Sequence, residues 1–127
     1  WKSKRDPNAY DIEIPEFGYR AQWNLSVDGS LWITAENSVE QVGCIHTCQG
    51  LELDYVGVII GQDLSFADGT VVVKPNNRSK QDRSIRGYRT RIKENPEVSC
   101  HVEKIVKNTY KTLMTRGMKG CYIYIDR

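Results

Sequence analysis

The sequence contains no long apolar run and carries almost no net charge. No stretch approaches the roughly 20 consecutive apolar residues that a helix needs to cross a bilayer, and no charged and then apolar leader follows Trp1. We therefore expect a soluble, cytoplasmic protein without a membrane partner. Lysine and arginine number 18 against 16 acidic residues, and the resulting charge of +2 does not by itself indicate a polyanionic partner.

Cysteine is also sparse. Cys44, Cys48, Cys100 and Cys121 lack the dense spacing of a secreted disulfide framework, so we expect reduced thiols. Cys44 and Cys48 alternate with His46, but paired Cys-x-x-Cys motifs are absent. We therefore expect no bound metal in this chain.

The composition is that of a folded domain, with 39% hydrophobic and 27% charged residues and no internal repeat. A chain of 127 residues is long enough for one core. It starts at Trp1 without a methionine, and we expect a single domain, residues 1–127, belonging to a longer protein. Residues 1–38 mix charge, proline and glycine and predict an irregular or β extension.

Apolar runs predict the strands. Residues 10–14 alternate as an edge strand does, and Asp28 and Gly29 indicate a turn. Residues 41–45 predict a short strand. Residues 55–60 form a nearly continuous β-branched run, which is typical of a strand buried on both faces of a parallel sheet.

The second half of the sequence predicts helices between further strands. Residues 63–73 indicate a hairpin that turns at Asp68 and Gly69. Residues 82–94 predict a basic helix, and residues 98–115 an amphipathic helix that ends at Gly117. Residues 121–125 predict a last strand. This order indicates an α/β architecture.

Basic residues cluster in two places that the net charge conceals. One cluster lies in residues 74–93, where eight basic residues face the single acid Asp82, and the other comprises Lys104, Lys107, Lys111, Arg116 and Lys119. A solvated helix face and a contact with nucleic acid explain such clusters equally well.

Two strings contain the most information about function. Residues 43–61 read GCIHTCQGLELDYVGVIIG, in which a glycine loop leads into an apolar strand. Residues 108–120 read NTYKTLMTRGMKG and lead into CYIYI, so that Thr115 and Arg116 lie between a helix and a strand.

These strings resemble motifs V and VI of superfamily 1 helicases. The sequences of both strings are similar to those of a bacterial family of uncharacterised DNA/RNA helicase-like, ATP-binding proteins that carry a domain of unknown function. The resemblance covers residues 10–127. It implies an α/β fold of the RecA-like, P-loop NTPase type, a mostly parallel sheet flanked by helices, which would be the second, C-terminal motor domain.

The resemblance also implies roles for the motif residues. Arg116 would be an arginine finger, because a guanidinium stabilises the charge that develops on a transferred phosphoryl group. Gly50 and Glu52 would lie near the nucleotide, with the Glu52 carboxylate on the ribose. Arg116 at a helix end also suits the helix dipole, and Glu52 suits the cap of a turn.

The remaining motif residues have less specific roles. His46 and Thr47 would contact the phosphates of nucleic acid, although a histidine at a strand end is as often satisfied locally. Gln49 suits either ligand. Leu53 and Gly117 depart from the helicase pattern, in which an aromatic residue and an alanine are usual, and this weakens the assignment to conventional unwinding enzymes.

No Gly-x-x-x-x-Gly-Lys-Ser/Thr loop occurs in the sequence. We therefore expect the isolated chain to be inactive and to hold no cofactor. ATP and Mg²⁺ would bind to the full-length protein, between this domain and an N-terminal RecA-like lobe of the same chain.

Two other functions fit the residues. One is a non-catalytic module that binds nucleic acid or protein and keeps a degenerate helicase fold. The other is a metal-dependent hydrolase or nuclease that uses His46, Glu52 and Asp63. Trp1, Trp23 and Trp32 could stack on bases or fill the core. Tyr110, Leu113 and Met114 lie on the apolar stripe of their helix and are expected to pack in the core.

Overall fold

The computed structural model describes residues 9–25, 29–79 and 82–126. Their contacts group the chain into two compact units, Trp1–Leu51 and Glu52–Arg127. In the described part of the chain the strands form three small sheets, of which one is three-stranded and two are two-stranded. Trp1 and Asp28, which the sequence analysis singled out, lie outside the described residues.

The first unit contains a short three-stranded sheet. Strands β1 (Ile12–Ile14) and β2 (Tyr19–Trp23) pair antiparallel, and β3 (Gln41–Val42) pairs parallel to β2. Ile12 and Ala21 face each other in the register and are fully buried. Two 3-10 turns, η2 (Gly29–Thr34) and η3 (Ser38–Glu40), lead to β3 and to the one-turn helix α1 (Ile45–Cys48).

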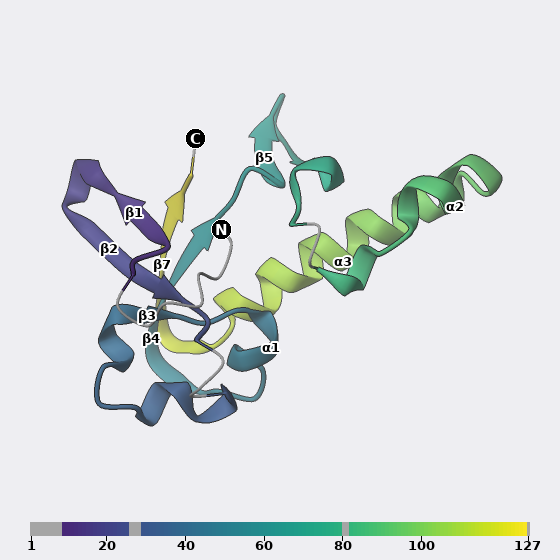
Figure 1. Cartoon of the computed structure of the whole chain (residues 1–127). Helices are drawn as coiled ribbons and strands as arrows, with labels where there is room; N and C mark the ends of the chain where they lie inside the picture. Colours follow the sequence, from purple (N-terminus) through teal and green to yellow (C-terminus); the bar gives the residue numbers. More distant parts are fainter. Residues whose placement is uncertain (1–8, 26–28, 80–81, 127) are drawn as a thin grey trace. The chain divides into compact units, whose positions relative to one another are not determined.

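The second unit is built on the parallel pair of β4 (Leu53–Ile60) and β7 (Gly117–Ile125), on which helix α3 (Glu97–Met114) packs (Figure 1). The core between them contains Val58, Ile60, Val106 and Tyr110, with Leu113 and Met114 packed against it. The predicted packing role of Tyr110, Leu113 and Met114 is therefore confirmed.

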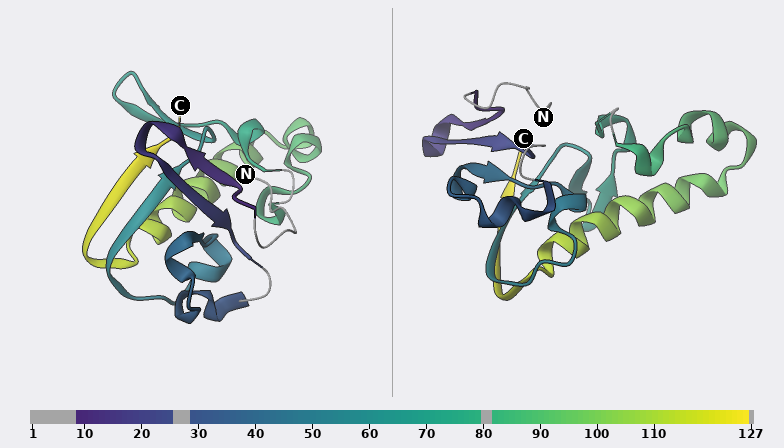
Figure 2. Two further views of the ribbon diagram at one scale, coloured as in Figure 1. Left: turned by 60° about the vertical axis from the view of Figure 1, so that its left-hand side comes forward. Right: turned by 60° about the horizontal axis from the view of Figure 1, so that its bottom comes forward.

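The chain between β4 and α3 forms a hairpin and a short helical arm. Strands β5 (Leu64–Ala67) and β6 (Thr70–Val73) pair antiparallel around Asp68 and Gly69, as predicted. The 3-10 turns η4 (Pro75–Asn77) and η5 (Arg83–Ile85) follow, and then helix α2 (Tyr88–Glu94). Helix α2 packs on the N-terminal half of α3, at the end that projects beyond the sheet (Figure 2).

The structure corrects two predicted elements. The strand over residues 41–45 ends at Val42, and Ile45 instead opens helix α1. The helix over residues 82–94 begins only at Tyr88, because Asp82 caps a separate 3-10 turn through the Ser84 amide and Gly87 lies in the left-handed region at φ 74°. The helix predicted over residues 98–115 is confirmed as α3.

The fold class is confirmed at the level of a mixed α/β protein. Among the strand pairs of the described residues, β2–β3 and β4–β7 are parallel and the other two are antiparallel, so the predicted mostly parallel sheet is observed only in part. The RecA-like type of fold stays a prediction. Among the described helices, none is long and apolar enough to cross a membrane.

A bulge in β7 lies directly after Arg116. Leu53 pairs with Gly117 and Tyr55 with Gly120, so two steps along β4 face three along β7. A Cβ on Gly117 would lie 2.2 Å from the carbonyl oxygen of Gly120 and 3.0 Å from Cγ1 of Val56. The bulge therefore has no room for an alanine at position 117.

We predict that Gly117→Ala destabilises the protein. The added methyl group must displace the backbone of the bulge, so we expect the free energy of unfolding to fall by about 1–3 kcal/mol in urea denaturation. Gly57→Ala is the matched control on β4, because a Cβ there meets no atom within 4 Å. Equal losses in the two variants would contradict a steric role for Gly117.

Candidate functional site

The side chain of Thr47 stabilises helix α1, which lies within the string over residues 43–61. The Thr47 hydroxyl accepts the Cys44 N–H at 3.0 Å and donates to Oδ1 of Asn24 at 2.9 Å. The Thr47 amide donates to the Cys44 carbonyl at 3.1 Å, and the Thr47 carbonyl accepts the indole N–H of Trp32 at 3.1 Å. The hydroxyl and the amide of Thr47, a residue predicted to touch phosphates, therefore also hold the loop together.

Other residues of this loop are open to solvent. His46, Gln49 and Gly50 are exposed, and Gly50 has φ 84°, a conformation that favours glycine. No atom lies within 4 Å of a Cβ built on Gly50. An imidazole, a carboxamide and the backbone at Gly50 are therefore open to solvent.

Cys48, the last residue of helix α1, is half-buried. Burial, and then the neighbouring Cys44, raises the pKa of the Cys48 thiol, while the hydrogen bond with Thr47 opposes the shift. The thiol is therefore neutral at physiological pH and behaves as an apolar side chain. Trp32 is half-buried and lies beside helix α1, to which its indole N–H donates. Trp23, in β2, is also half-buried, so both tryptophans contribute to packing.

In the second unit, Glu52 and Arg116 lie at the same end of the β4–β7 pair. The amide of Leu53 donates to the carbonyl of Arg116 at 2.9 Å. Leu53 is the first residue of β4, and Arg116 lies between α3 and β7. The exposed Glu52 therefore directly precedes a residue that is bonded to the backbone of the second motif.

The side chain of Arg116 folds back over the last turn of α3. Its Nε donates to the Thr112 carbonyl at 3.0 Å, and Nη2 lies 3.5 Å from the Thr115 hydroxyl. A cation at this position stabilises the negative end of the helix dipole. Arg116 is half-exposed.

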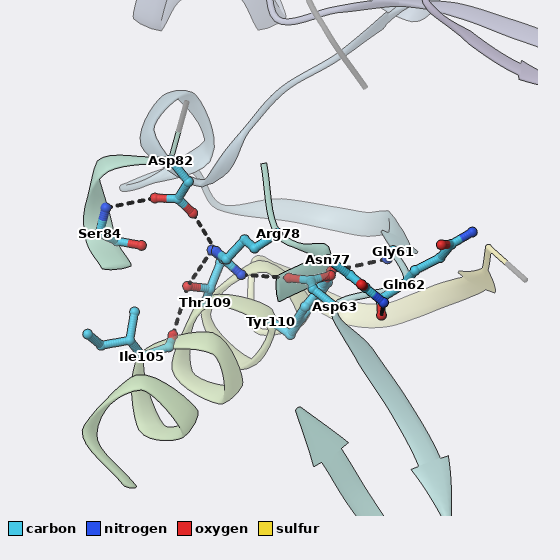
Figure 3. Close-up of polar contacts among 10 residues, drawn as sticks. All are labelled: Gly61, Gln62, Asp63, Asn77, Arg78, Asp82, Ser84, Ile105, Thr109 and Tyr110. Carbon is cyan, nitrogen blue, oxygen red and sulfur yellow. Dashed lines mark hydrogen bonds and ion pairs between the residues drawn. The ribbon is translucent and has the colours of Figure 1, made fainter. Parts of the chain in front are cut away.

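A buried polar network lies beyond the other end of β4 (Figure 3). Asp63 is 7% exposed; its Oδ1 accepts the Tyr110 hydroxyl at 2.6 Å and its Oδ2 pairs with Nη1 of Arg78 at 2.8 Å. Arg78 also pairs with Asp82 and lies 3.4 Å from the Thr109 hydroxyl. The Tyr110 hydroxyl in turn accepts the Gly61 N–H at 3.1 Å.

The length of β4 rules out the metal site that one of the predicted functions requires. Glu52 precedes β4 and Asp63 follows it, and eight strand residues between them span roughly 26 Å. The hypothesis of a metal-dependent hydrolase that uses His46, Glu52 and Asp63 together is therefore wrong. The Asp63 carboxylate is instead occupied by Arg78 and Tyr110.

The network was not predicted from the sequence, although one feature indicated it. An acidic residue that closely follows a buried strand lies where polar groups often gather in α/β proteins. The partners of Asp63 lie 15 and 47 residues away in the sequence, and no local pattern joins them.

Comparison with known proteins places the chain among helicase-like proteins. The family described as "Schlafen group 3, DNA/RNA helicase domain" matches residues 1–127. The uncharacterized protein YPL245W of Saccharomyces cerevisiae is 29% identical over 121 residues, which cover 94% of this chain and 26% of that protein. The chain thus spans about a quarter of the length of this relative. No solved structure matches.

The comparisons bear on the predicted family in two ways. The helicase-like family inferred from the two motifs is confirmed by the match over residues 1–127. Its bacterial character is not confirmed, since the relative named above is a yeast protein.

We predict that Thr47→Val weakens α1. The variant leaves the Cys44 amide and the Asn24 side chain without the hydroxyl, so the free energy of unfolding should fall by about 1 kcal/mol. Thr47→Ser keeps the hydroxyl and should unfold close to the wild type. A Thr47→Val protein as stable as Thr47→Ser would contradict the capping role.

We predict that ionisation of Tyr110 lowers the stability of the protein at high pH. Burial, and then the hydrogen bond with Asp63 and its charge, raises the pKa of Tyr110 above the ordinary value of about 10. The folded state therefore keeps this proton longer than the unfolded state does. The stabilisation is complete below about pH 10 and falls as the pH rises further, by up to about 1.4 kcal/mol per pH unit.

A comparison with Tyr110→Phe isolates this effect. The variant should lose about 1–3 kcal/mol at neutral pH, because Asp63 and the Gly61 amide lose a partner. Its stability should then fall less steeply than that of the wild type above pH 10. Parallel pH profiles in urea denaturation would contradict the raised pKa.

Proposed function

The chain belongs to the Schlafen group 3 DNA/RNA helicase family, and on this premise we propose that it is the C-terminal half of a superfamily 1 helicase-like ATPase. In this proposal the chain adopts the role of a RecA-like second motor domain. It supplies motifs V and VI to an ATP site that an N-terminal RecA-like lobe of the same protein completes, and it contacts nucleic acid.

The observation that carries the proposal is the hydrogen bond between Leu53 and Arg116. It joins the exit of motif V to the arginine of motif VI with an N···O distance of 2.9 Å, although the two residues lie 63 positions apart. An arginine finger must be held by rigid elements, because a displacement of about 1 Å at such a site can cost about 100-fold in rate. The β4 strand and the end of α3 provide that rigidity.

The residues of the two motifs have the chemistry that the proposed site requires. Arg116 carries a permanent, planar charge that matches the oxygens of a phosphoryl group. Glu52 is an exposed carboxylate that can accept a hydrogen bond from a ribose hydroxyl. Gly50 offers backbone without a side chain, and the adjacent Gln49 is exposed.

The remaining parts of the site would come from outside this chain. The sequence contains no phosphate-binding loop, so in the proposal the N-terminal lobe binds the phosphates of ATP together with Mg²⁺. Bound ATP would supply the γ-phosphoryl group, and Arg116 would stabilise the charge that develops on it. His46 and Thr47 would contact the phosphates of nucleic acid.

One contact favours a second function. The bond from Nε of Arg116 to the Thr112 carbonyl is what a purely structural arginine at a helix end would make. If Arg116 has only this role, the chain is a non-catalytic module that binds nucleic acid or protein.

Removing Arg116 separates the two functions. We predict that Arg116→Ala in the intact protein lowers ATP turnover by about 10³-fold, because the transition state loses its guanidinium. ATP affinity should change by less than about tenfold, because the finger acts mainly in the transition state. Steady-state turnover and nucleotide titration measure the two effects.

Two further variants control for structure and charge. Lys111→Gln removes one exposed charge from α3, near its C-terminal end, and should leave turnover unchanged. Arg116→Lys keeps the charge but not the forked geometry, and it should remain at least about tenfold impaired. Wild-type turnover in Arg116→Ala, with its unfolding midpoint also recorded, would favour the non-catalytic module.

A further inference from the structure

A run of basic side chains covers the turn before α2 and α2 itself. We call it the basic segment; it occupies residues 83–93, between Asp82, which pairs with Arg78, and Glu94, the last residue of α2. All of its basic side chains are exposed, and they are Arg83, Arg86, Arg89, Arg91 and Lys93. Four of the five are arginine, which binds phosphate oxygens through a planar fork.

These charges are not neutralised within the described part of the chain. Other basic residues there have acidic partners: Arg78 pairs with Asp63 and Asp82, Lys107 with Glu103, and Lys119 with Asp54. No such ion pair reaches the basic segment from any described residue. Nη2 of Arg91 donates to the Arg86 carbonyl at 2.9 Å. This bond stabilises the turn but does not neutralise the positive charge of Arg91.

This arrangement costs stability in the free protein. Arg89 and Lys93 lie one turn apart on α2, where like charges destabilise a helix. Only seven residues form α2, so it depends on packing against α3 rather than on its own helix propensity. A sequence that concentrates uncompensated charge on such a helix breaks a local rule, as sequences do at binding surfaces.

The apolar side of α2 excludes a membrane-surface helix as the explanation. Tyr88 and Ile92, the larger apolar side chains of α2, are half-buried, and α2 packs against α3. The outward side therefore offers charge without the apolar face that a bilayer-bound helix buries.

The basic segment is also remote from Arg116. It packs near the N-terminal end of α3, and Arg116 follows the C-terminal end (Figures 1 and 2). The 18 residues of α3 span about 27 Å at 1.5 Å per residue. A ligand of the basic segment is thus distinct from the nucleotide at motif VI.

We infer that the basic segment binds the sugar–phosphate backbone of nucleic acid without reading its sequence. The charges and their arginine-rich composition support a polyanion with phosphate groups, and the choice of nucleic acid rests on the proposed function. Each arginine would contact phosphate oxygens and release counterions, so binding would be strongly salt-dependent. The segment would add to the predicted contacts of His46 and Thr47.

The experiment removes three charges from the segment in the intact protein. The variant Arg86→Gln, Arg89→Gln, Lys93→Gln keeps the Arg91 side chain, which bonds to the Arg86 carbonyl. Of the replaced residues, Arg89 and Lys93 lie one turn apart on α2, and Arg86 lies in the turn before it. We expect affinity for an oligonucleotide of random sequence to fall at least about tenfold at low salt. The slope of log affinity against log salt should decrease by about 0.7–0.9 for each phosphate that the variant no longer neutralises.

A variant with the same change in charge provides the control. Lys104→Gln, Lys107→Gln, Lys111→Gln removes three exposed lysines of the second basic cluster, on α3, where Lys107 pairs with Glu103. The inference assigns no phosphate contact to these lysines, so the variant should weaken binding by less than about threefold, because only general charge attraction changes. Fluorescence anisotropy with single-stranded and duplex DNA and RNA measures both variants, and circular dichroism confirms that α2 and α3 remain helical. Equal decreases in affinity in the two variants would overturn the inference.

The remaining outcomes separate this inference from the proposed function. If the wild type binds nucleic acid and the basic-segment variant binds equally well, the inference fails and the proposed function stands. If poly-glutamate binds the wild type as tightly as nucleic acid and does not bind the same variant, the segment is instead a docking surface for acidic proteins. If the wild type binds no nucleic acid, both the inference and the nucleic-acid contact of the proposed function fail.

Discussion

The backbone hydrogen bond from Leu53 to Arg116 is the constraint on which the second unit depends. It starts the parallel pairing of β4 with β7 at Leu53, the first residue of β4. Arg116 in turn donates its amide to the Leu113 carbonyl at the end of α3, and β7 continues along β4 through the bulge at Gly117. Val58, Ile60 and Val106 are buried between the strands and the helix, so the position of the arginine is coupled to the core.

The parts of the fold that depend on local pattern could be predicted from the sequence. The β-branched run in β4, the apolar stripe of α3 and the Asp68–Gly69 turn each have a period or turn chemistry that one segment contains by itself. Helix α1 could not be predicted in this way. Its cap depends on Asn24 and its packing on Trp32, which lie 23 and 15 residues from Thr47. The pattern of residues 41–45 alone favours a strand.

The candidate site shows the same division. The resemblance to the helicase motifs singled out Glu52 and Arg116, whose roles at a nucleotide stay predictions. In the structure the amide of Leu53, the residue after Glu52, donates to the Arg116 carbonyl. Motif spacing did not reveal that Thr47 caps α1, or that Asp63 is held by Arg78 and Tyr110. The partners of Asp63 lie 15 and 47 residues away, so no local pattern connects them. The contact between Thr47 and Cys44 is local, but cysteine is not among the residues that commonly cap a helix. Two motif residues, Thr47 and Arg116, therefore make structural contacts in addition to their proposed roles.

The most direct test of the central claim is a structure of the intact protein with a non-hydrolysable ATP analogue and Mg²⁺. We predict that the Arg116 guanidinium leaves the Thr112 carbonyl and lies within about 3 Å of a γ-phosphate oxygen, while the Leu53 amide remains bonded to the Arg116 carbonyl. A guanidinium that stays on Thr112 while the nucleotide binds elsewhere would contradict the claim.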